Sequence, residues 1–452
     1  MILREVWKIS TSASIDQAIY QHPEQLLQNL IRFDTSNPPG NETECIKYIN
    51  GLLTGAGCET TILAKAPDRP NLIGRLNGQG NAPPLMLYGH VDVQITTNQT
   101  WQHPPFEGKI VDDYIWGRGA LDMKGGVAMM LASFLRAKAE GLAPAGDVVL
   151  VLLSDEEGLS NFGAKYLVES HPELFTNIRY ALGEFGGFTF YVDKQRFYPI
   201  QVAEKQVCLM KVYLRGPGGH GALRLRGSAM AKLGNLLQRL DKRHLPVHIT
   251  PVVRQMIQTT ASGLPFPANL VLRQLLTPRL TNLVLDLLGT RGEAFYPILH
   301  NTVNATIVHG GTNINVIPSE IVLQMDGRLL PGYTPDDVMA ELRQLSGTEL
   351  EFELLRYEPF PAKPDMGLFP TLAGILREAD PQGVPMPMLM PAISDARFFS
   401  KLGIQTYGFL PMKLPPGFNM MHLIHAADER IPVDAVSFGT EAIYKVLQRF
   451  GR

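Results

Sequence analysis

Short runs of consecutive apolar residues alternate along the first half of the chain with segments in which apolar residues recur at helical spacing. The apolar runs predict strands within 66–76 and at 85–88, 148–153 and 180–183. The helical spacing predicts helices at 15–30, 42–56 and 127–139. Strands that are apolar along their whole length and alternate with helices are typical of a mostly parallel sheet covered on both faces. The pattern therefore predicts an α/β domain.

The middle of the chain has a different order of elements. We expect a strand at 207–214, a helix at 228–239, strands at 303–308 and 321–329, a helix at 335–345 and a strand at 350–355. This order is the split βαβ, ferredoxin-like arrangement. Residues 247–300 form an insertion that is longer than an ordinary connection and contains an apolar helical run at 280–288, so we expect it to be structured.

Polar side chains follow three of the predicted strands at the point where each strand ends. They are His90 and Asp92, then Glu156 and Glu157, and finally Glu184. Parallel strands bring their carboxyl ends to one edge of a sheet, where ligands bind. Four carboxylates close together require a cation to neutralise them. The pattern predicts a metal site for zinc, with cobalt or manganese as substitutes, and supplies enough ligands for two ions.

Each of these motifs also has a simpler interpretation when it is taken alone. His90 at the end of a strand fits a capped turn, and acidic residues at 155–157 fit the solvated start of a helix. The glycine-rich stretch 117–126 fits a plain turn, and it lacks the Gly-Lys-Ser/Thr of a phosphate loop.

Composition narrows the class of protein. The 452 residues are 45% hydrophobic and 19% charged, which predicts a soluble globular protein of two or three domains. A net charge of -2 gives no basic excess, so neither a nucleic acid nor a membrane is expected as a partner. Three scattered cysteines, no secretion signal in residues 1–10 and no long uncharged apolar run predict a cytoplasmic location.

Seven stretches, in order along nearly the whole chain, resemble the co-catalytic zinc metallopeptidase family. That family includes aminoacylases, acetylornithine deacetylases, succinyl-diaminopimelate desuccinylases, glutamate carboxypeptidases and carnosinase-like dipeptidases. The stretches are 88–92, 116–126, 154–158, 216–221, 310–318, 394–397 and 425–432. The resemblance implies a mostly parallel-sheet catalytic domain built from residues 1–203 and 361–452. Residues 204–360 would be an inserted ferredoxin-like α+β lid and dimerisation domain, which carries the 247–300 insertion.

The resemblance also implies a set of ligands for two zinc ions. Asp122 would bridge the ions, while His90, Glu157, Glu184 and His425 would each bind one of them. The peptide bond between Asp122 and Met123 is expected to be cis.

Two further roles follow from the same resemblance. Asp92 would orient His90, and Glu156 would be the general base, free to take a proton because its neighbour Glu157 is held by a metal. His422 is a rival to His425 as the last ligand, although the sequence from His425 to Pro432 matches the family motif.

Three residues of the lid complete the expectation. His220 would stabilise the oxyanion in the active site of a partner subunit, which implies a homodimer; the alternative is a turn histidine set by neighbouring glycines. Asn315 and Arg328 would contact the substrate, and the guanidinium fork of an arginine suits a carboxylate.

The function implied is hydrolysis of the amide bond of a small N-acyl amino acid or peptide with a free carboxylate. Glu184, where relatives also use aspartate, resembles the deacylase and carboxypeptidase branches. Two alternatives stay open: a dipeptidase, and an inactive binding protein. The complete set of ligands and base argues against the inactive protein. Pro391, Ala392 and Ile393 replace glycines found in relatives, and this changes the leaving-group side of the pocket.

Overall fold

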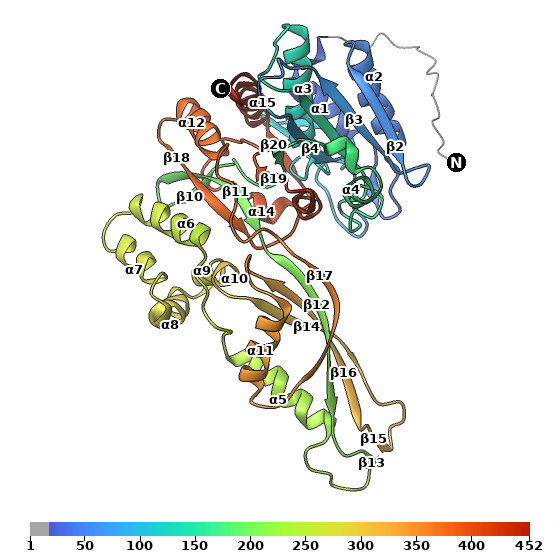
Figure 1. Ribbon diagram of the computed structural model, residues 1–452, viewed down its shortest axis with the longest axis vertical. Coiled ribbons are helices and arrows are strands. Elements are labelled where there is room, and N and C mark those ends of the chain that lie inside the picture. Colours follow the sequence, from blue (N-terminus) through green and yellow to red (C-terminus); the bar gives the residue numbers. More distant parts are fainter. Residues whose placement is uncertain (1–17) are drawn as a thin grey trace. The chain divides into compact units, whose positions relative to one another are not determined.

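The computed structural model describes residues 18–452 and divides into two compact units (Figure 1). One unit takes Met1–Tyr166 with Gly417–Arg452, and the other takes Leu167–Pro416. Residues 15–17 of the first predicted helix, and the stretch 1–10 in which no secretion signal was found, lie outside the described residues. The predicted domain limits near 203 and 360 are not tested by this division and stay a prediction.

The first unit is built on four strands in the order β2–β3–β8–β4. β8 pairs with β4 in parallel, whereas β3 pairs antiparallel with both β8 and β2. The bounds of these strands are β2 (Glu59–Ala64), β3 (Pro70–Leu76), β4 (Leu85–His90) and β8 (Val148–Leu153). Every residue of β4 and β8 is buried, as their continuous apolar runs predict. β2 was not predicted, because only its last three residues are apolar and half of its positions are exposed.

Helices cover these strands, α2 with one apolar side and α3 with nearly its whole surface buried. α2 packs on β2 and β3, while α3 packs on β4 and β8 and carries α1 and α15 on its outer side. The helices are η1 (Ile19–Gln21), α1 (Pro23–Ile31), α2 (Thr43–Gly55), α3 (Lys124–Ala139), α14 (Met420–Leu423) and α15 (Val433–Arg449). Short strands complete the unit: β1 (Ser36–Asn37), β5 (Val93–Gln94), β6 (Lys109–Val111), β7 (Tyr114–Trp116) and β20 (Arg430–Pro432). α4 (Ala164–Ser170) lies at the boundary between the units.

The second unit contains two sheets. In one, β9 pairs with β19 in parallel, and β11 pairs with β18 in parallel and with β10 and β19 antiparallel. The bounds are β9 (Tyr180–Gly183), β10 (Phe190–Val192), β11 (Gln195–Glu204), β18 (Gly383–Met390) and β19 (Gln405–Gly408), with helices η2 (Pro172–Phe175), α12 (Phe369–Ala379), α13 (Ala396–Phe399) and η3 (Ser400–Leu402). The α/β class is confirmed, with strands of both directions in each unit.

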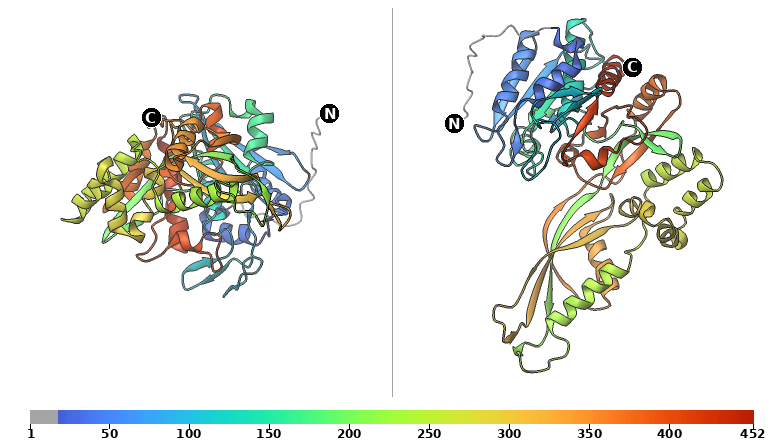
Figure 2. Two further views of the ribbon diagram at one scale, coloured as in Figure 1. Left: turned by 90° about the horizontal axis from the view of Figure 1, so that it is seen from below. Right: turned by 180° about the vertical axis from the view of Figure 1, so that it is seen from behind.

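The other sheet, the lid sheet, is antiparallel and has the order β14–β16–β12–β17. Two helices, α5 and α11, pack side by side against it and enclose a core of buried apolar residues (Figure 2). The bounds are β12 (Gln206–Arg215), α5 (Ala229–Lys242), β14 (Thr302–His309), β16 (Glu320–Leu329), α11 (Pro335–Ser346) and β17 (Glu351–Glu358). This is the predicted ferredoxin-like order of elements. A two-stranded extension, β13 (Gly219–His220) and β15 (Val316–Ile317), continues from it.

The predicted insertion is a group of helices between α5 and β14. They are α6 (Pro251–Ser262), α7 (Ala268–Gln274), α8 (Pro278–Leu288), α9 (Thr290–Glu293) and α10 (Tyr296–Leu299). α6 packs against β18 and β11, and α7 contacts both α6 and α8. The expectation that the insertion is structured is therefore confirmed. Within residues 18–452 the search for a helix long and apolar enough to cross a bilayer finds none.

Candidate metal centre

His90 stands at the end of β4 with one ring nitrogen fixed. Its Nδ1 lies 2.9 Å from the main-chain carbonyl of Asp92, and because a carbonyl only accepts, Nδ1 carries the proton. The lone pair of the neutral ring is then on Nε2, which lies 3.2 Å from Oδ1 of Asp122. The side chain is 2% exposed. This fixed tautomer and orientation are what a metal-binding imidazole requires.

Asp122 lies in the loop between β7 and α3 and offers one carboxylate oxygen to each of two histidines. Oδ1 faces His90, and Oδ2 lies 3.0 Å from Nε2 of His425. Burial alone would raise the pKa of the Asp122 carboxyl, but the imidazoles of His425 and His90 beside it outweigh burial and hold this pKa below its ordinary value. A carboxylate placed between two imidazoles in this way has the arrangement of a bridging ligand. The expected cis peptide bond between Asp122 and Met123 is confirmed.

Glu157 and His425 complete the group on the Oδ2 side of Asp122. Oε1 of Glu157 lies 3.3 Å from Nε2 of His425, and Oε2 accepts a hydrogen bond from Gln94. The hydrogen bond to Asp122 and the neighbouring carboxylate of Glu157 raise the pKa of His425 to about 10. Asp122, Glu157 and His425 offer three ligand atoms within 4.8 Å of one another.

The chemistry of this group fits a metal ion. Oε1 of Glu157 is buried and accepts no hydrogen bond within the described part of the chain. A buried carboxylate oxygen without a hydrogen bond is costly unless a cation takes its place. The residues present therefore suit a divalent ion held by oxygen and nitrogen ligands.

Asp92 holds the turn that carries Glu156 and Glu157. Its Oδ1 accepts from the main-chain nitrogen of Glu156, and its Oδ2 accepts from that of Glu157 and from the side chain of Asn37. Burial opposes ionisation of Asp92, but hydrogen bonds, first from His90, lower the pKa of its carboxyl. The predicted orientation of His90 comes mainly from the Asp92 carbonyl, since the Asp92 carboxylate is 3.5 Å from Nδ1.

Glu429 and Arg118 were not predicted, although both lie within the recognised motifs. Oε1 of Glu429 accepts from the main-chain nitrogens of Leu121 and Asp122, at 2.8 and 3.1 Å, and Oε2 lies 2.6 Å from Arg118. Arg118 also donates to the carbonyl of His425, whose backbone is left-handed with φ 61°. We call Arg118 and Glu429 the buried clamp, because one ion pair supports both Asp122 and His425.

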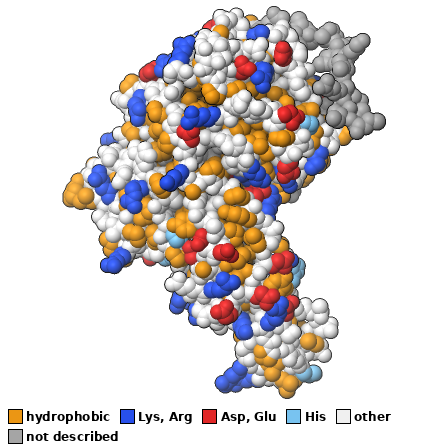
Figure 3. Space-filling view, viewed as in Figure 1, with side chains coloured by type: hydrophobic (Ala, Val, Ile, Leu, Met, Phe, Trp, Pro, Cys, Tyr) orange, Lys and Arg blue, Asp and Glu red, His pale blue; other side chains and the backbone are white. Residues whose placement is uncertain are grey.

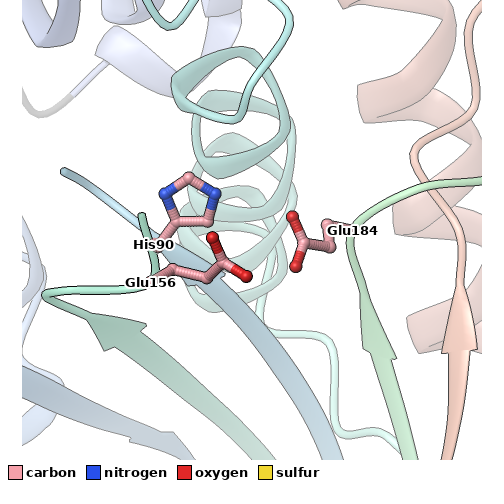
Figure 4. Close-up of side chains that lie close together, drawn as sticks. All are labelled: His90, Glu156 and Glu184. Atoms are coloured by element: carbon pink, nitrogen blue, oxygen red, sulfur yellow. The ribbon is translucent and has the colours of Figure 1, made fainter. Parts of the chain in front are cut away.

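Figure 4 shows the side chains of His90, at the end of β4, of Glu156, which follows β8, and of Glu184, which follows β9. These three residues are the other group of potential metal ligands in the described chain. His422 belongs to neither group. It lies on α14, and the structure places His425, not His422, beside Asp122 and Glu157.

The three lid residues lie in the second unit and their roles stay predictions. Nδ1 of His220 accepts from the main-chain nitrogen of Ala222, and the carbonyl of Asn315 accepts from Gly221, so both residues belong to the β13–β15 extension. The guanidinium of Arg328 forks onto Asp326, with bonds of 2.7 and 3.0 Å. Arg328 is thus already shaped to hold a carboxylate.

Comparison with known proteins agrees with the resemblance read from the motifs. Residues 86–449 match the model described as Peptidase family M20/M25/M40. The chain is 26% identical over 384 residues to human N-fatty-acyl-amino acid synthase/hydrolase PM20D1, covering 82% of this chain and 75% of the relative.

Solved structures share the fold. The M20 family metallo-carboxypeptidase Sso-CP2 from Sulfolobus solfataricus has a TM-score of 0.64 at 17% identity, over 96% of this chain and 99% of that one. The Bacillus subtilis YXEP protein, a dinuclear metal binding peptidase from the M20 family, has a TM-score of 0.58 at 13% identity, over 96% of this chain and 98% of that one. The chain, with its clustered imidazoles and carboxylates, thus belongs to peptidase family M20/M25/M40 and is a metallohydrolase.

Proposed function

We propose that this enzyme hydrolyses the amide bond of an N-acyl amino acid or small peptide that carries a free carboxylate. The observation that carries the proposal is Asp122, whose two oxygens each face one imidazole, as in a site for two ions. The relative PM20D1 is named for N-fatty-acyl-amino acids, and Sso-CP2 is a metallo-carboxypeptidase. Both names describe an acyl group joined to an amino acid with a carboxylate.

The proposed ligand set is that of two zinc ions. Asp122 is shared, Glu157 and His425 complete one site, and His90 with Glu184 completes the other. One imidazole in each site, with carboxylate oxygens around it, is within the ligand range of zinc. Two such ions, when bound, supply a Lewis acid for the scissile carbonyl and lower the pKa of water.

Glu156 is the proposed general base. Its neighbour Glu157 is engaged by Gln94 and His425, whereas the Glu156 carboxylate belongs to the His90 side of the centre. Asp92 fixes the main chain of both glutamates, so that one side chain is held for a metal and the other for proton transfer. In the proposed reaction Glu156 takes a proton from the attacking water and returns it to the leaving amine.

The lid supplies the remaining groups in this proposal. His220 donates a hydrogen bond to the oxyanion. Arg328 and Asn315 hold the substrate carboxylate, and the Arg328 guanidinium that binds it is the one that donates to Asp326 in the structure. Because His220 lies on the exposed β13–β15 extension, we propose that it acts in the active site of a second copy, in a homodimer.

The test is the variant Glu156→Gln, assayed on N-acetyl amino acids, N-fatty-acyl amino acids and dipeptides with added zinc, cobalt or manganese. We expect kcat to fall by a factor of about 10² to 10⁴ because proton transfer is lost, while metal content measured by mass spectrometry stays the same. Glu59→Gln, at an exposed position of β2, is the matched control and keeps full activity. A Glu156→Gln enzyme with unchanged kcat would assign the base to another residue. A wild-type protein that binds no metal would contradict the proposal.

A further inference from the structure

The insertion exposes large apolar side chains at an unusual density. Among residues 18–452, six of the twenty exposed large hydrophobic side chains fall between positions 266 and 287. They are Phe266, Leu270, Val271, Leu280, Leu283 and Leu287, and the first and last are 76% and 77% exposed. Single exposed leucines are ordinary, but a contiguous group marks a surface that meets another phase or partner. We call these six residues, with Arg273 and Arg279, the α7–α8 face.

The apolar residues are presented by regular helices, so the face is a built surface. On α8, Leu280, Leu283 and Leu287 recur at spacings of three and four and share one side, while Thr281, Val284 and Leu285 are buried on the other. α7 adds Leu270 and Val271, and buries Leu272. Phe266 stands in the turn that leads into α7. α7 and α8 contact each other, so these exposed residues lie on neighbouring helices.

The charge of this region is strongly one-sided. From position 242 to position 293 the chain has six Lys or Arg, namely Lys242, Arg243, Arg254, Arg273, Arg279 and Arg291, against two acidic residues, Asp286 and Glu293. Arg254, Arg273 and Arg279 are exposed, and within residues 18–452 none of these three forms an ion pair, whereas Asp286 pairs with His244. Figure 3 shows basic and hydrophobic side chains intermixed over this part of the molecule. The sequence expectation of no membrane partner depended on the net charge of the whole chain, which conceals this local excess.

We propose that the α7–α8 face docks on the surface of an anionic lipid bilayer. Phe266 and the leucines would enter the boundary between headgroups and acyl chains, and Arg273 and Arg279 would pair with lipid phosphates. A symmetric contact with a second copy is a poorer fit, because the one carboxylate of α8, Asp286, already pairs with His244 at 3.3 Å, so the arginines of two copies would meet without an opposing charge. A bilayer supplies both the apolar phase and the negative charge that would balance the arginines.

The test is co-sedimentation of the full-length protein with two kinds of vesicle, phosphatidylcholine alone and phosphatidylcholine with roughly 30% phosphatidylglycerol. We expect at least about tenfold more protein bound to the anionic vesicles, and a loss of most of this binding in high salt. Leu283→Ser with Leu287→Ser removes the apolar contact, and Arg273→Gln with Arg279→Gln removes the charge. Each pair is expected to reduce binding by about tenfold.

The matched control changes Leu354 and Leu355 of β17 to serine, since both are exposed leucines outside the insertion. The control is expected to bind like the wild type, and circular dichroism checks that every variant is folded. Equal binding by all variants, or no binding to anionic vesicles, would overturn the proposal. If the leucine pair instead changes the mass in solution from two copies to one and vesicles do not bind, the face is a contact between copies and the lipid proposal is wrong.

Discussion

The loops around Asp122 and the α7–α8 face use charged and apolar side chains in opposite ways. In the loops, Arg118 is buried and its charge is met by Glu429. On the face, arginines are exposed without an ion pair and leucines point outward. Burying a charge pair costs solvation and adds little stability, so its benefit lies in fixing positions. The comparison indicates that the loops around Asp122 fix the positions of metal ligands, whereas the α7–α8 face is suited to contact a surface outside the chain.

The largest expected effect comes from breaking the buried clamp with Glu429→Gln. The glutamine keeps an oxygen for the nitrogens of Leu121 and Asp122, but it leaves the charge of Arg118 buried without its partner. We expect the free energy of unfolding to fall by about 3 kcal/mol. We also expect metal affinity, measured by titration calorimetry, to fall by about 10- to 100-fold, since Asp122 and His425 lose a common support.

The control for the clamp is Glu320→Gln, which breaks an exposed pair with Arg215 on the lid sheet. An exposed pair contributes little because water screens it, so this variant should unfold like the wild type and bind metal equally well. If both variants change stability and metal affinity equally, the buried clamp does not position Asp122 and His425, and the contrast between the two regions is wrong.

Lys205 is another buried basic side chain. Unlike Arg118, which pairs with a carboxylate, it donates its hydrogen bonds to uncharged oxygens. Its Nζ donates to the carbonyl of His300 and to Oγ1 of Thr302, both at 2.9 Å, where the insertion returns to the lid sheet. Burial lowers the pKa of Lys205 from 10.5 to about 7. Between these two values the unfolded chain holds one more proton than the folded chain, so stability rises with pH.

The variant Lys205→Met removes this titration. The free energy of unfolding of the wild type, relative to that of Lys205→Met, should increase from pH 7.5 to pH 9 by up to about 2 kcal/mol, at no more than about 1.4 kcal/mol per pH unit. Urea denaturation at the two pH values measures the difference. A difference that is independent of pH would show that Lys205 keeps its proton when folded, and so resembles Arg118.

The two regions also differ in how far the sequence predicts them. Continuous apolar runs locate β4 and β8, and the polar residues that follow place His90, Asp92, Glu156 and Glu157 correctly at strand ends. The motifs then add Asp122 and His425. The clamp escaped prediction because an arginine and a glutamate some 300 positions apart reveal nothing of their pairing until the chain is folded. β2 was not predicted because this half-exposed edge strand has only three apolar residues, too short a run to mark a strand.

The insertion shows a different limit of sequence reasoning. The apolar run at 280–288 correctly predicts a helix, but its periodicity does not tell which side is covered. Leu285 and Leu287 are two positions apart on α8, and one is 5% exposed while the other is 77% exposed. Only packing against the neighbouring helices decides between them. The excess of basic over acidic residues in 242–293 is visible in the sequence, but its meaning depends on that packing.

The smallest expected effect is that of Leu287→Ala, and its comparison with Leu285→Ala tests whether the α7–α8 face is free. Leu285→Ala should reduce the free energy of unfolding by about 2 to 5 kcal/mol, because it leaves a cavity. Leu287→Ala makes the same chemical change on the same helix, so the change in helix propensity cancels, and an exposed site should change stability by less than about 0.5 kcal/mol. Urea denaturation of both variants at two protein concentrations measures this. A large cost for Leu287→Ala that grows with concentration would mean that another copy already covers the face, and a bilayer could then reach it only by displacing that copy.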